Sequence, residues 1–468
     1  MTHACRNARS LHIVALAALL SACLLLPACA VPVKPVAQKW VATWGQAMTS
    51  QVARVAGRDG KPERDAWGQP VERAPTVDHL TLRQSVNASA GGERVRIRLS
   101  NYYGRTPLTV SAARIALGAG HADDLSAIEP GSDRPLSFDG GKPSITIAPG
   151  REVVSDPVAL RLPALANVVV SLYFGGPAQL ADFHPMEQAH TTYAVDGDAT
   201  RLPSLAQLPA AHALPRTRDD HIYVLAGIEV EAPAGTRGIV AFGDSITDGA
   251  FASAPGTTWP GVLAGLAQRH GDAAAVVNAG ISADELATDQ VGRPAAGASG
   301  LKRFLRDVID RPGVTDVVVL FGANDIDRGI DPAGYPNGAS AGDLIAAMRM
   351  LADVAHQHHL RIYAGTVTPF AGVADWYSPR REAVRLQFNA WIRQSGTFDG
   401  VVDFSGAVAG AYKPPPLAAQ QSPLPVGMAS VCAGDAGLHP NDRGYVVMGT
   451  LAYNVLFHAA LQPLQACH

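Results

Sequence analysis

The fold is decided by the stretch 238–249, which reads Gly238-Ile-Val-Ala-Phe-Gly-Asp-Ser-Ile-Thr-Asp-Gly249. Its beginning is an apolar run of strand length, and a helical stretch begins near Ser245. A serine that directly follows a buried strand lies at the sheet edge, where its own N–H and the helix-start amides favour developing negative charge. Ser245 is therefore a candidate nucleophile, and the alternative is that it is a helix N-cap.

Beyond about residue 235 the sequence alternates between apolar strand-like runs and stretches with helical spacing. Such alternation is typical of a parallel sheet covered by helices on both faces, with functional groups just past the carboxyl ends of the strands. We therefore predict an α/β fold with strands at 238–242, 276–277, 317–321, 362–367 and 401–404 and helices at 259–269, 301–309, 344–358, 380–393 and 445–461.

The preceding part, from about residue 80 to residue 230, has the pattern of short β-strands. The segment Arg94-Val-Arg-Ile-Arg-Leu-Ser100 places apolar side chains on one face of a strand and arginines on the other. Gly, Pro and Asp clusters separate the candidate strands, which lie at 80–86, 94–100, 108–115, 144–147, 168–174 and 222–230. This pattern favours a β-sandwich or jelly-roll-like domain, and the polar stretch 49–77 is predicted to be a long loop.

Three later segments carry polar groups where predicted strands end. Gly280 offers an unhindered backbone N–H, and Asn324 offers a side-chain amide. Near the end of the sequence, Asp435 lies four residues before His439. An ester hydrolase needs a nucleophile, a base, an acid that orients the base and donors for the oxyanion, and these segments supply candidates for all four.

Together these segments resemble the conserved blocks of the SGNH (GDSL-type) hydrolase family, in the family's order: Gly243-Asp-Ser245, the glycine at 280, Gly322-Ala-Asn324-Asp325 and His439-Pro-Asn441. The resemblance covers roughly residue 235 to the end, about half of the chain. It implies an SGNH-type flavodoxin-like parallel sheet flanked by helices and the chemistry of a serine esterase. Ser245 is then the nucleophile and His439 the base, and the Ser245 N–H, the Gly280 N–H and the Asn324 side chain hold the oxyanion.

The N-terminal part is similar to secreted members of that family that place a β-rich domain before the hydrolase domain. The segments Trp40-Val-Ala-Thr-Trp44, Arg98-Leu-Ser-Asn101 and Val154-Ser-Asp-Pro157 carry this likeness. We accordingly expect a signal peptide at 1–30, a β-rich accessory domain at 31–234 and a hydrolase domain at 235–468. Residues 40–44 are a candidate for packing against the hydrolase domain.

The resemblance has one departure, at the acid that orients the base. The family usually places an aspartate three residues before the histidine, whereas position 436 here is alanine. We predict that Asp435 is the acid, because residues four apart are neighbours on a helical turn and Gly437 can adopt the positive φ that absorbs the extra residue. Its competitor is Asp442, which we expect instead to be the N-cap of the closing helix. A dyad without an acid stays open.

The first thirty residues have the composition of a targeting segment. Arg6 and Arg9 form a basic start, Leu11–Leu26 is an apolar core, and the small residues Ala28-Cys-Ala30 follow. The alternative is a retained membrane anchor, but the run is short for a span and no basic stop-transfer sequence follows. We expect an exported protein with no stable transmembrane segment after cleavage, located in the periplasm, outside the cell or on the outer surface.

Which peptidase cuts this segment stays open. The sequence Ala28-x-Ala30 fits an ordinary signal peptidase, whereas the residues before Cys29 and before Cys23 resemble bacterial lipoprotein boxes. A lipid anchor at Cys29 is therefore one of the alternatives. Outside the leader the chain has Cys432 and Cys467, and two cysteines in an oxidising compartment suggest one disulfide. The alternative is two unrelated thiols.

Composition places the chain among ordered globular proteins. Its 468 residues exceed one ordinary core, and 47% hydrophobic against 17% charged residues exclude a disordered chain. The net charge of −3 and the lack of a long basic run argue against a nucleic-acid partner.

The predicted chemistry uses no metal and no cofactor. His356, His358 and His359 could mimic a metal site, but they lack carboxylate support and are expected to lie at a solvated helix end. Asp244 and Asp325, beside the candidate nucleophile and donor, are expected to bond loop amides.

Two functions remain open from the sequence. The first is a serine esterase for a small-molecule or polysaccharide ester: an acetylated polysaccharide, a short-chain aryl or alkyl ester, or a phospholipid. The second is a catalytically degenerate SGNH scaffold that binds glycans. The segments 329–342 and 413–428 contain no long apolar run of the kind that forms a lipid-binding lid, so we expect short acyl groups.

Overall fold

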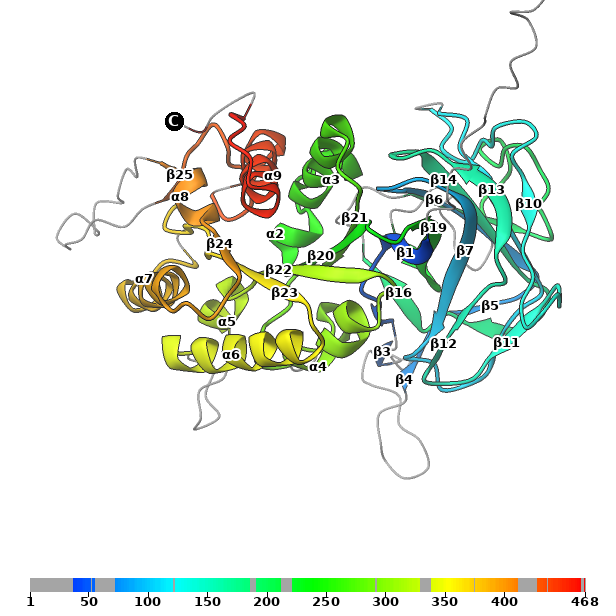
Figure 1. The fold of residues 1–468 in the computed structure, drawn as a ribbon. Coiled ribbons are helices and arrows are strands. Elements are labelled where there is room, and N and C mark those ends of the chain that lie inside the picture. The colour runs from blue at the N-terminus through cyan, green and yellow to red at the C-terminus, as the bar shows by residue number, and fades with distance from the viewer. Residues whose placement is uncertain are drawn as a thin grey trace, which may run out of the picture. The chain divides into compact units, whose positions relative to one another are not determined.

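A five-stranded parallel sheet organises the carboxyl-terminal part of the chain in the computed structural model (Figure 1). Its strands lie in the order β21-β20-β22-β23-β24, and every neighbouring pair is parallel. The strands are β20 (Arg237–Gly243), β21 (Ala274–Gly280), β22 (Val314–Leu320), β23 (Arg361–Gly365) and β24 (Gly400–Val402). This is the flavodoxin-like order, with the first strand of the unit inside the sheet and the topological switch point beside it.

The structure describes residues 37–51, 53–54, 72–120, 123–185, 191–211, 221–290, 293–328, 338–373, 375–410, 427–435, 437–463 and 467. The predicted signal peptide and the alternative lipid anchor at Cys29 lie outside these residues, as do most of the segments 329–342 and 413–428.

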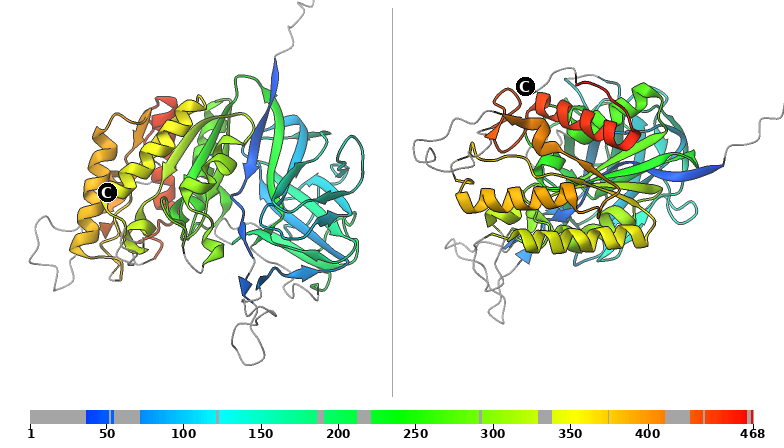
Figure 2. Two further views of the ribbon diagram at one scale, coloured as in Figure 1. Left: turned by 90° about the horizontal axis from the view of Figure 1, so that it is seen from below. Right: turned by 60° about the vertical axis from the view of Figure 1, so that its left-hand side comes forward.

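Helices cover both faces of the parallel sheet (Figure 2). They are α2 (Ser245–Asp248), α3 (Trp259–His270), α4 (Gly300–Phe304), α5 (Ala323–Arg328), α6 (Ala341–Gln357), α7 (Pro379–Gln394), α8 (Phe404–Val408) and α9 (Asp442–Phe457). Two 3₁₀ turns, η1 (Pro255–Thr257) and η2 (Pro294–Ala296), and one π-helical segment, η3 (Leu305–Ile309), complete the set within the described residues. Each strand and helix predicted after residue 235 is present, with ends shifted by four residues or fewer, except that the predicted helix 301–309 is divided between α4 and η3.

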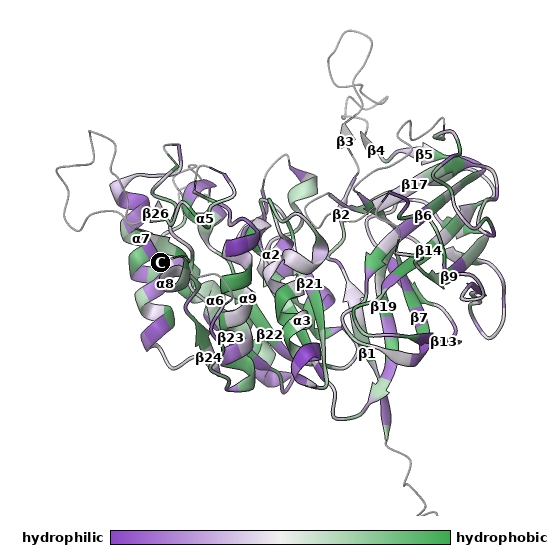
Figure 3. Cartoon of the chain, turned by 90° about the horizontal axis from the view of Figure 1, so that it is seen from above, coloured by the Kyte–Doolittle hydropathy of each residue, from purple (hydrophilic) through white to green (hydrophobic). Residues whose placement is uncertain are grey.

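Side chains of each strand alternate between two apolar cores, one on each face of the sheet. Val240 and Phe242 of β20 belong to the core shared with α6 and α7, whereas Ile239 and Ala241 belong to the core shared with α3 and α9. The strands of this sheet are accordingly hydrophobic along much of their length, as the green in Figure 3 shows. Burial on both faces is why these strands read as continuous apolar runs in the sequence.

The preceding part of the chain is a mostly antiparallel β region with two five-stranded sheets. One contains β1 (Gln38–Gly45), β19 (Leu225–Pro233), β7 (Gly92–Asn101), β12 (Arg151–Val154) and β13 (Val158–Leu162). The other contains β10 (Arg134–Pro135), β9 (Ala112–Leu117), β14 (Asn167–Phe174), β6 (Leu80–Asn87) and β17 (Thr191–Asp196). The two sheets share one apolar core, which agrees with the predicted β-rich architecture.

Strand β7 has the alternation that its sequence predicts. Val95, Ile97 and Leu99 are fully buried in the core, whereas Arg96 and Arg98 both bond the carboxylate of Glu229 on the neighbouring strand β19. The outward arginines therefore bridge strands, while the inward apolar residues stabilise the contact between the sheets.

Three expectations for the β region were too coarse. The predicted strands at 108–115 and 222–230 are each divided, into β8 (Leu108–Val110) and β9, and into β18 (Ile222–Tyr223) and β19. Val224 has a φ of 63°, which breaks the second run. The predicted loop 49–77 contains four short strands among its described residues: β2 (Thr49–Ser50), β3 (Ala53–Arg54), β4 (Glu72–Arg73) and β5 (Thr76–Val77). Strands β2 and β5 pair with distant segments, whereas β3 and β4 pair with each other.

Other short strands pair locally or with these pieces. They are β11 (Ile145–Ile147), β15 (Ala178–Gln179), β16 (Asp182–His184), β25 (Ala409–Gly410) and β26 (Gly427–Met428). Strand β16 lies between β18 and β2 in a three-stranded sheet. None of the helices in the described ranges is long and apolar enough to cross a membrane.

Strand β1 contacts both parts of the chain. Val41 and Trp44 belong to the core of the β region, whereas Ala42 belongs to a core of the parallel sheet and donates its N–H to the carbonyl of Pro312 at 3.0 Å. Residues 38–468 form one compact unit. The division into domains at 234/235 stays a prediction.

Candidate active site

Three neighbouring strands of the parallel sheet end at the same level. Gly243 at the end of β20 pairs with Gly280 of β21 on one side and with Leu320 of β22 on the other. Ser245 and Asn324 follow the ends of β20 and β22 within a few residues. The predicted nucleophile and its predicted oxyanion donors therefore lie at one edge of the sheet, beside the switch point where such folds bind ligands.

A short, tightly capped helix carries Ser245. The Asp244 side chain accepts a hydrogen bond from the Ile246 N–H at 3.0 Å, and Gly249, with a φ of 115°, ends the helix after one turn. Ser245 is the first helical residue, so the alternative that it is the N-cap is wrong, because Asp244 has that position. The Ser245 N–H belongs to the helix start, where backbone donors have no partner within the helix.

Ser245, His439 and Asp435 form a continuous chain of hydrogen bonds. The Ser245 Oγ lies 2.9 Å from the His439 Nε2, and the His439 Nδ1 lies 2.7 Å from an oxygen of Asp435. Because a carboxylate only accepts, Nδ1 carries the proton and Nε2 is left as an acceptor for the serine hydroxyl. This is the arrangement in which a histidine can take the proton of a nucleophilic serine.

The loop before His439 holds Asp435 by its second oxygen. That oxygen accepts the N–H groups of Gly437, Leu438 and His439 at 3.0, 2.8 and 3.1 Å. Gly437 has the positive φ that we expected, 109°. Burial raises the pKa of Asp435, but the bonds from the His439 ring and from these amides outweigh burial and hold the pKa well below its ordinary value. Asp435 is therefore ionised and oriented towards His439 across the four-residue spacing.

The competitor Asp442 contacts a different loop. Its carboxylate accepts bonds from the Ser253 N–H and hydroxyl at 2.8 and 2.5 Å and from the Thr257 hydroxyl at 2.9 Å. The prediction that Asp442 is an N-cap was wrong, because Asn441 caps α9 by accepting the N–H of Gly444. Asp442 instead ties the loop that follows the nucleophile to the helix that follows the base.

Phe251 lies at the site and was not predicted from the sequence. Its ring stacks on the His439 imidazole, with centroids 5.5 Å apart and planes at 28°, yet 58% of the residue is exposed. It also has a φ of 66°, which is unfavourable for a bulky residue. An exposed aromatic ring beside the base is a surface against which part of a substrate can pack. The signal available in the sequence was the position of this apolar residue, between the segment that contains Ser245 and the next predicted helix.

The predicted oxyanion donors differ in their present partners. Asn324 is buried and donates one side-chain N–H to the Asp284 carbonyl at 3.0 Å, so its amide retains a second N–H. The Gly280 N–H donates to the Asn278 side chain at 3.0 Å. A role of Gly280 towards a substrate therefore requires that this N–H be shared or released, and both oxyanion roles stay predictions.

Aspartates beside the site bond loop amides, as expected. Asp325 accepts the N–H groups of Leu286 and Ala287 at 2.9 and 3.0 Å, and Asp244 accepts that of Ile246. Burial raises the pKa of Asp325 to about 6 and that of Asp244 to about 7. Their oxygens shape the loops around the strand ends and are not directed at the Ser245 hydroxyl by any described bond.

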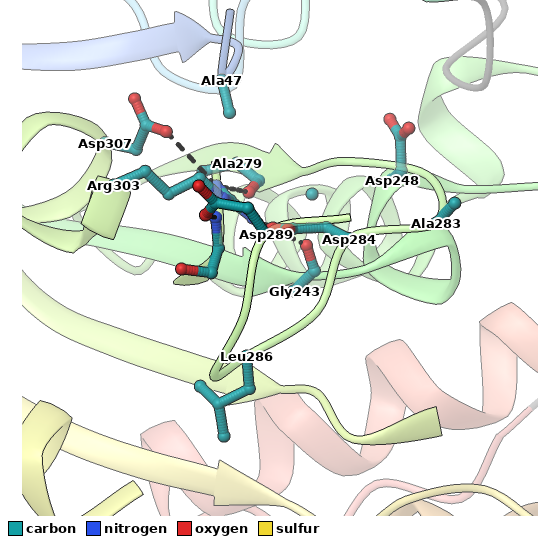
Figure 4. A network of polar contacts seen from close by, with 12 residues as sticks. Ala47, Gly243, Asp248, Ala279, Ala283, Asp284, Leu286, Asp289, Arg303 and Asp307 are labelled. Atoms are coloured by element: carbon teal, nitrogen blue, oxygen red, sulfur yellow. Dashed lines mark hydrogen bonds and ion pairs between the residues drawn. The ribbon is translucent and has the colours of Figure 1, made fainter. Parts of the chain in front are cut away.

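The buried guanidinium of Arg303 connects the ends of two neighbouring strands. Figure 4 shows Arg303 bonded to Asp284 at 2.7 Å and to the backbone carbonyls of Ala279 and Gly243, which precede Gly280 and Asp244. Asp307 lies 3.3 Å from the same guanidinium. The ends of β20 and β21 are thus held together by one side chain from α4.

Cys432 and Cys467 form a disulfide in the structure, with Cα atoms 5.8 Å apart. Cys432 also pairs through its backbone carbonyl with Asn441, next to the His439 loop. Within the described ranges, no group of His, Cys, Asp and Glu side chains could hold a metal ion. Of the three clustered histidines, His356 lies 3.0 Å from Asp399, and His358 and His359 follow at the exposed end of α6.

The chain is similar to known proteins over its carboxyl-terminal part. Residues 241–447 match the model of the GDSL-like Lipase/Acylhydrolase family. A GDSL-like lipase from Bacteroides thetaiotaomicron is similar at 17% identity over 46% of this chain and 84% of that one, with a TM-score of 0.31. The native M. smegmatis aryl esterase is similar at 16% identity over 47% and 97%, with a TM-score of 0.35.

A third similar structure is a mutant of an acetyl-xylooligosaccharide esterase from Geobacillus, at 23% identity over 47% of this chain and 92% of that one, with a TM-score of 0.33. A search of curated proteins found no match. Residues 241–447 form a domain of the GDSL-like lipase/acylhydrolase family, so the resemblance is confirmed for this part of the chain. The likeness of the N-terminal part to secreted members of the family stays a prediction.

Proposed function

We propose that the protein is a serine esterase that cleaves short acyl esters through an acyl-enzyme on Ser245. The observation that carries this proposal is the hydrogen-bonded series from the Ser245 hydroxyl through His439 to the Asp435 carboxylate. The family of the surrounding domain supports an acylhydrolase in the coarser sense.

In the first half of the reaction, the Ser245 Oγ forms a bond to the ester carbonyl carbon while its proton passes to the His439 Nε2. Asp435 stabilises the resulting imidazolium, because its ionised oxygen already accepts the Nδ1 proton. The negative charge on the former carbonyl oxygen is held by the Ser245 N–H and the free N–H of Asn324, with Gly280 as a third donor if its present bond is released.

Collapse of this intermediate breaks the ester bond, and His439 donates its proton to the departing alcohol. In the second half, water gives a proton to His439 and attacks the acyl carbon, which releases the acid and restores the serine. The proton of each step passes through the His439 Nε2, which lies 2.9 Å from the Ser245 Oγ and returns the last proton to that oxygen when the acid departs.

The substrate class is proposed from the sequence. Short acyl groups, including acetyl groups of carbohydrates, suit a chain whose segments 329–342 and 413–428 have no long apolar run. We further propose export, because residues 1–30 have the composition of a leader and because the Cys432–Cys467 pair suits an oxidising compartment.

The test is turnover of p-nitrophenyl acetate with labelling by a fluorophosphonate probe. Wild-type protein should release a burst of p-nitrophenol and take up the probe. Ser245→Ala should lose both, with kcat lower by roughly 10⁶-fold, because the nucleophile acts as a unit with His439. Ser340→Ala is the matched control, since Ser340 caps the distant helix α6, and it should label like wild type.

Equal labelling of Ser245→Ala would contradict the assignment. No hydrolysis by wild-type protein across an acyl-length series, tested beside acetylated xylan and pectin, would favour the alternative of a degenerate glycan-binding protein.

A further inference from the structure

A buried histidine of the β region contacts the helix that carries Ser245. His184 ends β16, outside the residues that match the hydrolase family, and its side chain is 1% exposed. Its Nε2 lies 2.9 Å from an oxygen of Asp248, the last residue of α2. Its Nδ1 lies 2.8 Å from the backbone carbonyl of Ala47.

The number of N–H groups on the His184 ring limits how it can make both bonds. Both ring nitrogens of His184 face acceptors, and a neutral imidazole has one N–H. Two bonds therefore require either an imidazolium beside the Asp248 carboxylate or a proton on that carboxyl group. Burial lowers the pKa of His184, but the Asp248 charge and the bonds to Asp248 and Ala47 raise it by more, which favours the imidazolium.

Asp248 connects α2 to the loop that contains the predicted oxyanion donor. While one carboxylate oxygen faces His184, the other accepts the Ser282 N–H at 3.1 Å, two residues beyond Gly280. Asn278 reinforces this junction by donating to the carbonyls of Thr247 and Asp248 at 2.8 and 3.1 Å.

The fit at this junction is close. A Cβ added to Gly280 would lie 2.2 Å from the Asp248 N, so the end of β21 lies directly against the backbone of α2. Any shift of Asp248 therefore moves α2 relative to Gly280. The Asp248 carboxylate is thus one of the groups that set the distance between the nucleophile and an oxyanion donor, together with Asn278.

Other bonds between the β region and the hydrolase domain end on different segments. The Tyr103 hydroxyl accepts from Arg306 of η3 at 3.1 Å, and the Ser89 hydroxyl accepts from the Val276 N–H in the middle of β21 at 2.9 Å. These bonds attach the two parts, whereas the His184 bond reaches the turn of helix that contains Ser245.

We propose that His184 is a positioning residue for the ester hydrolysis: through Asp248 it holds the Ser245 helix at its working distance from the Gly280 loop. The β region then contributes to catalysis and is not merely an attached module. This inference rests on the proposed function of Ser245.

The experiment compares the full-length variants His184→Leu, His184→Gln and Asp248→Asn with wild type on p-nitrophenyl acetate, with thermal unfolding recorded for each. His184→Leu should lower kcat by up to about 10²-fold with little change in KM, as displacement of reacting groups by about 1 Å can do. His184→Gln restores an N–H donor towards Asp248 and should recover part of kcat. Tyr103→Phe is the matched control, because it removes a different bond between the same parts, and its kcat should equal that of wild type.

A double-mutant cycle separates positioning from stability. If His184 acts through Asp248, His184→Gln combined with Asp248→Asn should lose no more kcat than the stronger single variant. Wild-type kcat in folded His184→Leu, or equal kcat losses in His184→Leu and Tyr103→Phe, would overturn the inference. If His184→Leu does not fold, the decision rests on His184→Gln and Asp248→Asn, and unchanged kcat in both overturns it. Absence of esterase activity in wild type would show instead that the proposed function is wrong, and the inference would fall with it.

Discussion

The antiparallel β region and the parallel sheet each bury an arginine completely, but they surround it with different partners. Arg83 of β6 bonds the Ser171 hydroxyl and the carbonyls of Ser126, Ala199 and Thr200. Arg303 of α4 bonds Asp284 and Asp307 as well as carbonyls.

The difference follows from how the strands are connected. In the antiparallel region, loops return next to their own strands, and Arg83 joins two such loops through neutral acceptors. Burial accordingly lowers the pKa of Arg83 to about 10, with only partial compensation from Asp133 and Asp124. In the parallel sheet, successive strand ends meet at one edge, and the carboxyl groups of Asp284 and Asp307 lie around Arg303, whose guanidinium also bonds the carbonyl of Gly243 at the end of β20. We expect substitution of Arg83 in the first region to act through stability and substitution beside Ser245 in the second to act through rate; His184, whose bond reaches the Ser245 helix, is the exception in the β region.

After that of the nucleophile, the largest expected effect is at the acid. Asp435→Asn should lower kcat by about 10⁴-fold, because an amide favours the wrong imidazole tautomer while the geometry is kept. Steady-state kinetics on p-nitrophenyl acetate measures the change. Asp442→Asn is the matched control and should lose stability with near wild-type kcat, since Asp442 bonds the loop at Ser253 and Thr257. Equal kcat losses in the two variants would refute the assignment of Asp435.

The same variant has a signature in the pH dependence of stability. The pKa of Asp435 is lowered on folding, so its contribution is complete above the ordinary value of 3.8 and is lost as the pH falls below it. We expect the Tm difference between wild type and Asp435→Asn to be constant near about pH 5 and to shrink towards about pH 2. A difference that grows on acidification would mean that Asp435 is not an ionised, hydrogen-bonded group.

A smaller loss of rate is expected at the oxyanion donor. Asn324→Ala should lower kcat by roughly 10²–10³-fold with a smaller change in KM, because the amide is directed at charge that develops in the transition state. Asn454→Ala is the control, since Asn454 also bonds backbone groups, at Leu461 beyond α9. A raised KM with unchanged kcat would make Asn324 a residue for ground-state binding.

Substitution of Arg83 in the β region should lower stability and leave the rate unchanged. Arg83→Met leaves backbone carbonyls without donors and should lower the free energy of unfolding by roughly 1–3 kcal/mol while kcat stays at the wild-type value. Urea denaturation and kinetics on one preparation check both. Arg161→Met, at a side chain that is 85% exposed, should change neither. A loss of kcat in folded Arg83→Met would contradict the expectation that substitution of Arg83 affects stability and not rate.

The smallest effect concerns the ring beside the base. Phe251→Ala should lower kcat/KM for phenyl acetate by about 2- to 10-fold, the size of one aromatic contact, and that for ethyl acetate by less. Met350→Ala, on the exposed face of α6, is the control for loss of an exposed apolar side chain. Equal losses for both substrates would mean that Phe251 acts on His439 and not on the alcohol.

Much of the hydrolase domain could be predicted because its signals are local. A buried parallel strand is a continuous apolar run, and a polar residue after it must lie at the carboxyl edge, so Ser245, Gly280 and Asn324 could be placed from the sequence. The positive φ of Gly437 was predictable for the same reason, since one residue had to absorb the added length of its loop.

What the tertiary structure alone decided are contacts between residues far apart in the chain. Asp435 could be chosen over Asp442 from local spacing, but the partner of Asp442 could not, because its bond to Ser253 joins residues 189 apart in the chain. The bond from His184 to Asp248 spans 64 residues and joins a short strand to a one-turn helix, neither of which has a periodic signal. Sequence periodicity reports which face of an element is buried; the partner across a polar contact is set by packing, because only packing brings the two groups within hydrogen-bond distance.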